Sequence, residues 1–116
     1  MNQKEVQILV KAKRIAQHRP WWEALFPMIA QKRSLTARHE WTLYCKSLIM
    51  QAKNFEDAWF VLCESPSSGD ARDACIIIAA NFAKRLEDIN MVSAKAGFNS
   101  KYEQLITTAR SAILDS

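Results

Sequence analysis

Residues 74–80 read Ala-Cys-Ile-Ile-Ile-Ala-Ala, an unbroken run of apolar side chains. A helix that is apolar around its whole circumference lies inside a protein core. The three isoleucines could also form a buried strand, since β-branched residues favour strands. The flanking alanines and the lack of a second strand-like segment favour a helix. We therefore expect a central hydrophobic helix over about residues 71–96, ending at Gly97, where glycine can adopt the left-handed conformation that terminates helices.

The part of the chain before this segment carries further helical patterns. Apolar residues recur at three- and four-residue steps over about residues 2–18, which predicts a first helix. A short second helix is expected at 21–26, and Pro27 should kink or restart it because proline removes a backbone hydrogen bond. Ser34 or Thr36 is expected to cap the third helix. The inward line of this third helix is Trp41, Tyr44, Cys45, Leu48 and Ala52.

Two more caps and one loop complete the predicted fold. Asn54 is expected to cap a fourth helix, and Ser100 with Glu103 matches a capping box that opens the last one. Residues 65–70 form the only loop of strong turn composition, which separates an N-terminal basic helical part from a C-terminal two-helix part. The sequence thus predicts an all-α fold over residues 1–116: a single compact domain of five or six helices, with antiparallel helix hairpins around the central helix.

Composition supports this class. The chain has 116 residues with a hydrophobic fraction of 49% and only two Gly and three Pro, which is typical of a helix-rich globular domain. The odd set of three Cys lies in apolar segments, so we expect reduced, buried thiols. Charges scattered from Lys4 to Arg14 argue against a signal peptide, and no apolar run approaches the length of a membrane span. We expect a cytoplasmic protein that does not enter a membrane.

Charge divides the chain unequally. Residues 1–53 carry ten Lys or Arg and three Glu, whereas residues 54–116 carry six basic and nine acidic residues. The halves are therefore +7 and −3, which sum to the net charge of +4. A segregated positive half attracts polyanions or an acidic protein surface.

Two basic ridges are expected on the N-terminal helices, because seven-residue steps stay on one side of a helix. The first ridge is Lys4, Lys11 and His18, and the second is His39, Lys46 and Lys53. Lying side by side with the Trp21-Trp22 pair between them, they would track the phosphates of DNA or RNA. The sequence therefore predicts a non-catalytic protein that docks on a nucleic-acid backbone as a small subunit or regulator of a larger nucleoprotein complex. The predicted contacts are Lys4, Lys11, Arg14, Arg19, Trp21, Trp22, Lys32, Arg33, Arg38, Lys46 and Lys53.

The sequence is also compatible with a second class of function. One alternative is a protein-binding adaptor or inhibitor of the phage or plasmid type, which would act through exposed Trp, Leu and Met and through charged helix faces. Leu43 and Met50 form a second apolar line on the third helix, which we expect to pack beneath the tryptophan segment or to form an exposed contact surface. In general character, though in no motif, the chain is similar to the small helical subunits of CRISPR effector complexes, and this similarity implies a nucleic-acid path.

Signatures of catalysis are weak. Arg33 and His39 have a spacing that resembles the arginine–histidine motif of small helical ribonucleases of the HEPN type, but Ser34 and Leu35 replace the polar residue that usually follows the arginine. No paired spacing such as CxxC or HExxH is present. We therefore expect no enzyme activity, no metal and no cofactor.

Overall fold

The computed structural model describes residues 2–18, 21–97 and 99–115. Within these residues the chain forms six α-helices, one short 3-10 helix and no strand, which confirms the all-α, single-domain fold. The apolar run at 74–80 is helical, so the strand alternative is excluded. The elements are α1 Gln3–Gln17, η1 Trp21–Ala24, α2 Pro27–Gln51, α3 Phe55–Glu64, α4 Asp70–Phe82, α5 Leu86–Ala96 and α6 Ser100–Leu114.

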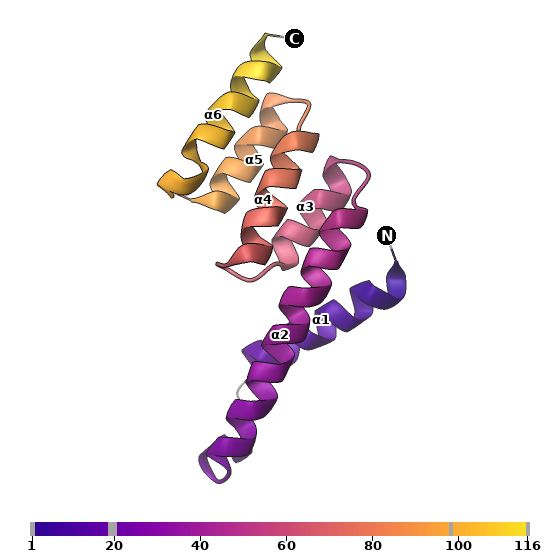
Figure 1. The fold of residues 1–116 in the computed structure, drawn as a ribbon, viewed down its shortest axis with the longest axis vertical. Helices are drawn as coiled ribbons and strands as arrows, with labels where there is room; N and C mark the ends of the chain where they lie inside the picture. Colours follow the sequence, from indigo (N-terminus) through magenta and orange to yellow (C-terminus); the bar gives the residue numbers. More distant parts are fainter. Residues whose placement is uncertain (1, 19–20, 98, 116) are drawn as a thin grey trace.

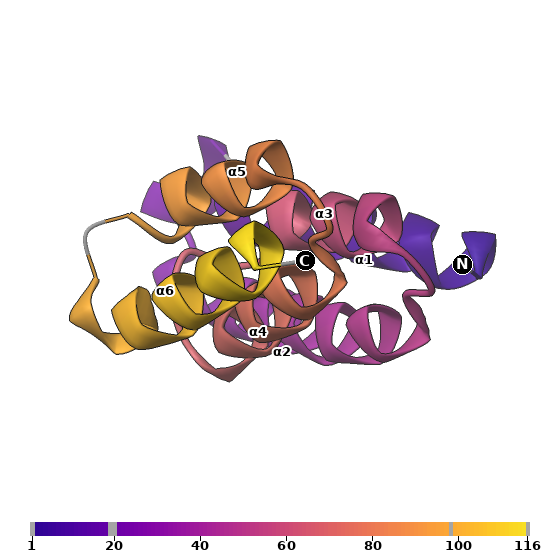
Figure 2. The same ribbon diagram turned by 90° about the horizontal axis from the view of Figure 1, so that it is seen from above.

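Consecutive helices pair as antiparallel hairpins that stack along the molecule (Figure 1). Helices α3 and α5 lie in one layer, and α2, α4 and α6 lie in the other (Figure 2). Helix α4 contacts α2, α3, α5 and α6. It is therefore the central helix of the fold, as its apolar sequence predicts.

The core follows from the apolar positions of these helices. On α4 the buried side chains include Cys75, Ile76 and Ala79, but Ile77 is 45% exposed, so one side of the apolar run reaches the surface. Each of the other helices adds fully or largely buried residues to this single core. They include Leu9, Ala12, Leu48, Ile49, Val61, Leu62, Ile89, Val92, Tyr102 and Ile106.

The predicted single helix over 71–96 is wrong, because the chain breaks it between Phe82 and Leu86. Asp88 lies in the first turn of α5, after this break. Its buried carboxylate accepts a hydrogen bond from the backbone N–H of Lys84 at 3.2 Å and another from the Arg85 guanidinium at 3.3 Å. A carboxylate in the first turn of a helix is also favoured by the helix dipole. These contacts stabilise the start of α5, which packs as a separate helix.

The start of α2 also differs from the prediction. Pro27 occupies the first turn, so α2 begins there and not at a cap by Ser34 or Thr36. Proline is accepted in a first turn because that position needs no N–H donor. The Thr36 hydroxyl donates to the carbonyl of Lys32 at 3.0 Å, the bond by which a threonine is accommodated inside a helix. Pro27 thus restarts the helix, which was one of the two expected outcomes.

The remaining caps are mostly as expected. The Asn54 side chain accepts from the N–H of Asp57 at 2.8 Å and caps α3, as predicted. Gly97 ends α5 with a φ of 72°. Helix α6 is capped by Asn99, whose side chain accepts from Lys101 N–H at 3.0 Å, so Ser100 is its first helical residue and not its cap.

One end of the molecule is a projecting arm, which we define as residues 21–40. Helix α2 is 25 residues long, and in Figure 1 its first half extends away from α3–α6 beside α1 and η1. The molecule measures 58 × 30 × 18 Å and has a radius of gyration of 16.3 Å, against about 13 Å for a globular domain of this size. The arm is the source of this elongation.

Candidate interaction surface

The tip of the arm is built by a tight turn that leaves apolar side chains outside. The carbonyl of Trp22 accepts hydrogen bonds from the N–H groups of Leu25 and Phe26, both at 3.0 Å, and the Phe26 carbonyl accepts from Ala30 at 3.1 Å. These bonds hold η1 against the start of α2. Pro27 lies between them and fixes where α2 begins.

Exposed apolar residues are concentrated on this half of the chain. Among the described residues, nine large apolar side chains are more than half exposed, and eight of them lie between positions 21 and 50. Scattered exposed apolar residues are normal on soluble proteins, but a contiguous group marks an interaction site. The eight are Trp21, Leu25, Phe26, Met28, Ile29, Leu35, Leu43 and Met50, and the ninth is Leu114.

Four of these side chains form a line along α2, at steps of seven or eight residues. Met28, Leu35, Leu43 and Met50 are 83%, 60%, 54% and 75% exposed. Two turns of helix contain about seven residues, so these positions share one side of α2, the side opposite the buried line through Ala37. Three exposed basic residues alternate with them on the same side. We call the whole set the outer stripe: Met28, Lys32, Leu35, His39, Leu43, Lys46 and Met50.

The predicted second apolar line is therefore a surface. The expected packing of Leu43 and Met50 beneath the tryptophan segment is wrong, because that segment sits at the tip of the arm and both side chains are exposed. The other expected outcome, an exposed contact surface, is the one found.

The two predicted basic ridges lie on exposed sides of α1 and α2. Lys4 and Lys11 are exposed on α1 and His18 directly after it, whereas Leu9 and Ala12 form the buried side of this helix. His39 and Lys46 lie on the side of α2 away from its buried line, and Lys53 is exposed beyond the end of this helix. That the two ridges form one common basic surface stays a prediction.

The predicted contact residues are distributed over α1, the arm and the second half of α2 with the residues after it. Lys4, Lys11 and Arg14 are exposed on α1, Lys32, Arg33 and Arg38 are exposed on the arm, and Lys53 is exposed after α2. Arg19 lies outside the described residues. Among the described residues, Lys32 and Arg38 have no carboxylate partner, whereas Lys46 lies 3.7 Å from Asp70 in an exposed ion pair.

The two candidate stacking tryptophans have different surroundings. Trp21 is 83% exposed. Trp22 is half-buried, and the Arg33 guanidinium lies 6.0 Å from its ring centroid, within the range of a cation–π contact. Arg33 is thus on a different side of α2 from His39 on the outer stripe, which separates the two groups of the ribonuclease-like spacing. Only Trp21 presents a free ring.

Titratable groups elsewhere hold the helices together. Asp73 on α4 accepts hydrogen bonds from the Lys101 ammonium and from the Tyr102 hydroxyl on α6, and these bonds lower the pKa of Asp73. Burial, together with the hydrogen bond to Asp73, raises the pKa of Tyr102 to about 12. This cluster joins α4 to α6.

The cysteines are free thiols, as expected, although Cys63 is only half-buried. The sulfur atoms of Cys45 on α2 and Cys75 on α4 lie 3.5 Å apart in the core. The hydrogen bond to Cys45 and burial raise the pKa of the Cys75 thiol. A buried, protonated thiol is a poor nucleophile.

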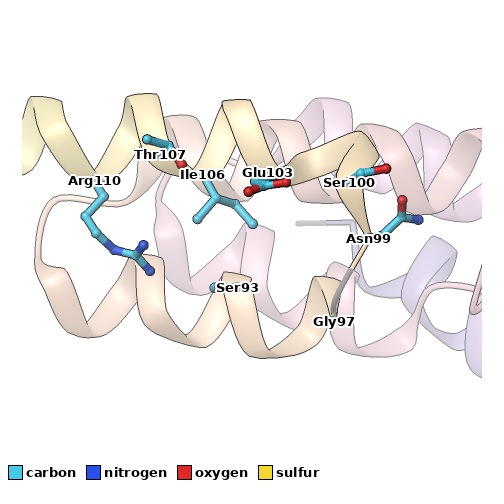
Figure 3. A pocket seen from close by; sticks show the side chains of 8 residues that line it. All are labelled: Ser93, Gly97, Asn99, Ser100, Glu103, Ile106, Thr107 and Arg110. Atoms are coloured by element: carbon cyan, nitrogen blue, oxygen red, sulfur yellow. The ribbon is translucent and has the colours of Figure 1, made fainter.

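One open cleft of the molecule is lined by both polar and apolar side chains. The cleft between α5 and α6 has a volume of about 390 Å³, and Figure 3 shows Arg110 reaching from α6 toward α5 beside Ile106. The Arg110 guanidinium donates to the Asn90 side chain at 3.2 Å. Every buried polar side-chain atom in the described part of the chain has a hydrogen-bond partner.

Within residues 2–18, 21–97 and 99–115, no three His, Cys, Asp or Glu side chains lie together as a metal site would require. None of the helices described combines the length and the apolar character needed to cross a membrane.

Comparison with family models, curated proteins and solved structures gives no significant match.

Proposed function

We propose that this chain is a protein-binding adaptor that docks on its partner through the arm and the outer stripe of α2. The observation that supports this proposal is the concentration of eight exposed apolar side chains between Trp21 and Met50. Removing apolar side chains from water is the main favourable contribution to most protein associations. Aromatic and Met residues are also the types enriched at protein interfaces. We place the adaptor in the cytoplasm, which suits its three free thiols.

Site-specific photo-crosslinking in the native cell tests this function. A photoreactive phenylalanine analogue replaces Leu35 on the outer stripe in one variant and Leu114 at the end of α6 in the other. Both side chains are more than half exposed, so the variants differ mainly in position. We expect a covalent protein adduct from position 35 and none from position 114, whether or not the lysate is treated with nuclease. Equal labelling from both positions, or none from position 35, contradicts the proposal.

A nucleic-acid backbone is the second candidate partner. Its support is Lys32 and Arg38, which have no carboxylate partner among the described residues and stand on the same arm as the exposed ring of Trp21. Such binding would weaken steeply with salt, since each phosphate contact releases close to one counterion. Fluorescence anisotropy of labelled random-sequence duplex and single strands, at 50 and at 200 mM salt, separates the candidates. A steep salt-dependent affinity that Lys32→Glu abolishes favours nucleic acid, and no binding at low salt removes it.

A further inference from the structure

The outer stripe has the length and the residue spacing of a surface against which one further helix can pack. Its four apolar residues, from Met28 to Met50, extend over about 33 Å at a rise of about 1.5 Å per residue. Steps of seven and eight residues match the interval at which a neighbouring helix presents its own apolar side chains. No described element packs over this side of α2, where the four side chains are 54–83% exposed.

The charges of the stripe indicate which helix fits. Lys32, His39 and Lys46 alternate with the apolar residues instead of flanking them. Helix α2 as a whole carries four Lys or Arg and one Glu, Glu40. Opposite charges across a helix pair set the choice of partner. A helix that carries carboxylates between its apolar residues therefore complements this surface.

A second copy of the chain is a poor occupant. In an antiparallel pair of stripes, Lys32 would face Lys46 of the other copy. In a parallel pair each of these lysines would face its own equivalent. Like charges at helix interfaces are unfavourable.

A lipid surface is also a poor occupant. Helices that lie in a membrane interface carry their cations at the edges of a broad apolar face. Here Lys32 and Lys46 stand within the apolar line, where hydrocarbon would surround them without a counter-charge.

We propose that the outer stripe binds an acidic amphipathic helix of the partner protein, which packs leucine-like side chains against Met28, Leu35, Leu43 and Met50 and carboxylates against Lys32 and Lys46. This inference rests on the proposed adaptor function and specifies the chemistry of its partner. The exposed ion pair of Lys46 with Asp70, at 3.7 Å, already places one carboxylate beside the stripe. Exposed pairs of this kind contribute little to stability, so a partner carboxylate can share or replace Asp70.

Two synthetic helices test the inference on the full chain. The acidic probe is a 25-residue helical peptide with Leu at seven-residue intervals and Glu at the intervening seam positions. The matched probe has Lys in place of every Glu. We expect isothermal titration to detect binding of the acidic probe alone, with an affinity that falls between 50 and 500 mM salt.

Charge reversal makes the test specific to the stripe. Lys32→Glu with Lys46→Glu should weaken the acidic probe about tenfold or more and create binding of the basic probe. The control variant, Lys4→Glu with Lys11→Glu, makes the same change in charge on α1, outside the outer stripe, and should leave the affinity for the acidic probe within about twofold. Equal effects of the two variants, or no binding of the acidic probe to the unaltered chain, overturn the inference.

The outcomes also separate this inference from the proposed function. A protein crosslinked at position 35, together with failure of the acidic probe, leaves the adaptor function standing and removes the acidic helix. Binding of anionic vesicles that charge reversal at Lys32 and Lys46 abolishes, or a concentration-dependent dimer that Leu35→Gln disrupts, assigns the stripe to lipid or to a second copy and overturns the inference. Loss of both crosslink and probe binding removes both proposals.

Discussion

Replacing Leu35 by Gln should cost little stability, although the same change at Leu48 on the same helix should be severe. Leu35 is 60% exposed and Leu48 is 0% exposed. Full burial of a Leu side chain contributes about 1.5–3 kcal/mol, so the smaller buried part of Leu35 contributes about 1 kcal/mol at most. Leu48→Gln loses the whole contribution and also buries an amide without a partner, for a total of about 4 kcal/mol.

Urea unfolding followed by far-UV circular dichroism measures both variants. Each is compared with the unaltered chain at two protein concentrations tenfold apart, so that any self-association appears as a shift in midpoint. A loss of more than about 2 kcal/mol in Leu35→Gln would refute the reasoning, because it would mean that the outer stripe is already covered in the free protein.

Two further predictions concern contacts between and within the helices. Burial and the hydrogen bond to Asp73 raise the pKa of Tyr102 to about 12, from about 10 in the unfolded chain. The contribution of the Tyr102 hydroxyl to folding stability is therefore complete below pH 10 and is lost as the pH rises through 12. The difference in urea midpoint between the unaltered chain and Tyr102→Phe should shrink over this range, and a constant difference contradicts this prediction. Asp88→Ala leaves the Lys84 N–H without its acceptor and should lower the free energy of unfolding by about 1–3 kcal/mol, measured by urea unfolding. Asp88→Asn should lower it less, because the amide oxygen remains as an acceptor. Equal, negligible losses in the two variants contradict this prediction.

The helices themselves could be predicted because their signals are local. The apolar line of α3, the Asn54 cap and the terminating glycine at 97 all depend on residues within a few positions of one another. The break before α5 could not be predicted in this way. No Gly or Pro marks it, and the contacts that Asp88 makes with Lys84 and Arg85 at the start of α5 follow no simple sequence pattern.

The residues of the candidate site could be predicted from the sequence only in part, because α2 is apolar on more than one side. Leu48 and Met50 are two residues apart on the same helix, yet one is fully buried and the other is 75% exposed. Periodicity shows that both belong to apolar lines but not which line faces the core. The relation between the two basic ridges was likewise hidden, since it depends on which faces of α1 and α2 pack together.

The most direct test of a docking surface on α2 uses three methionines of the chain as reporters. Met28 and Met50 on the outer stripe are 83% and 75% exposed, and Met91 on α5 is 38% exposed. Hydroxyl-radical oxidation, read by mass spectrometry, is compared between the purified protein and the protein in an extract of its native cell. The account predicts that Met28 and Met50 become protected in the extract while Met91 reacts as before. Unchanged oxidation of Met28 and Met50, measured against Met91, would contradict it.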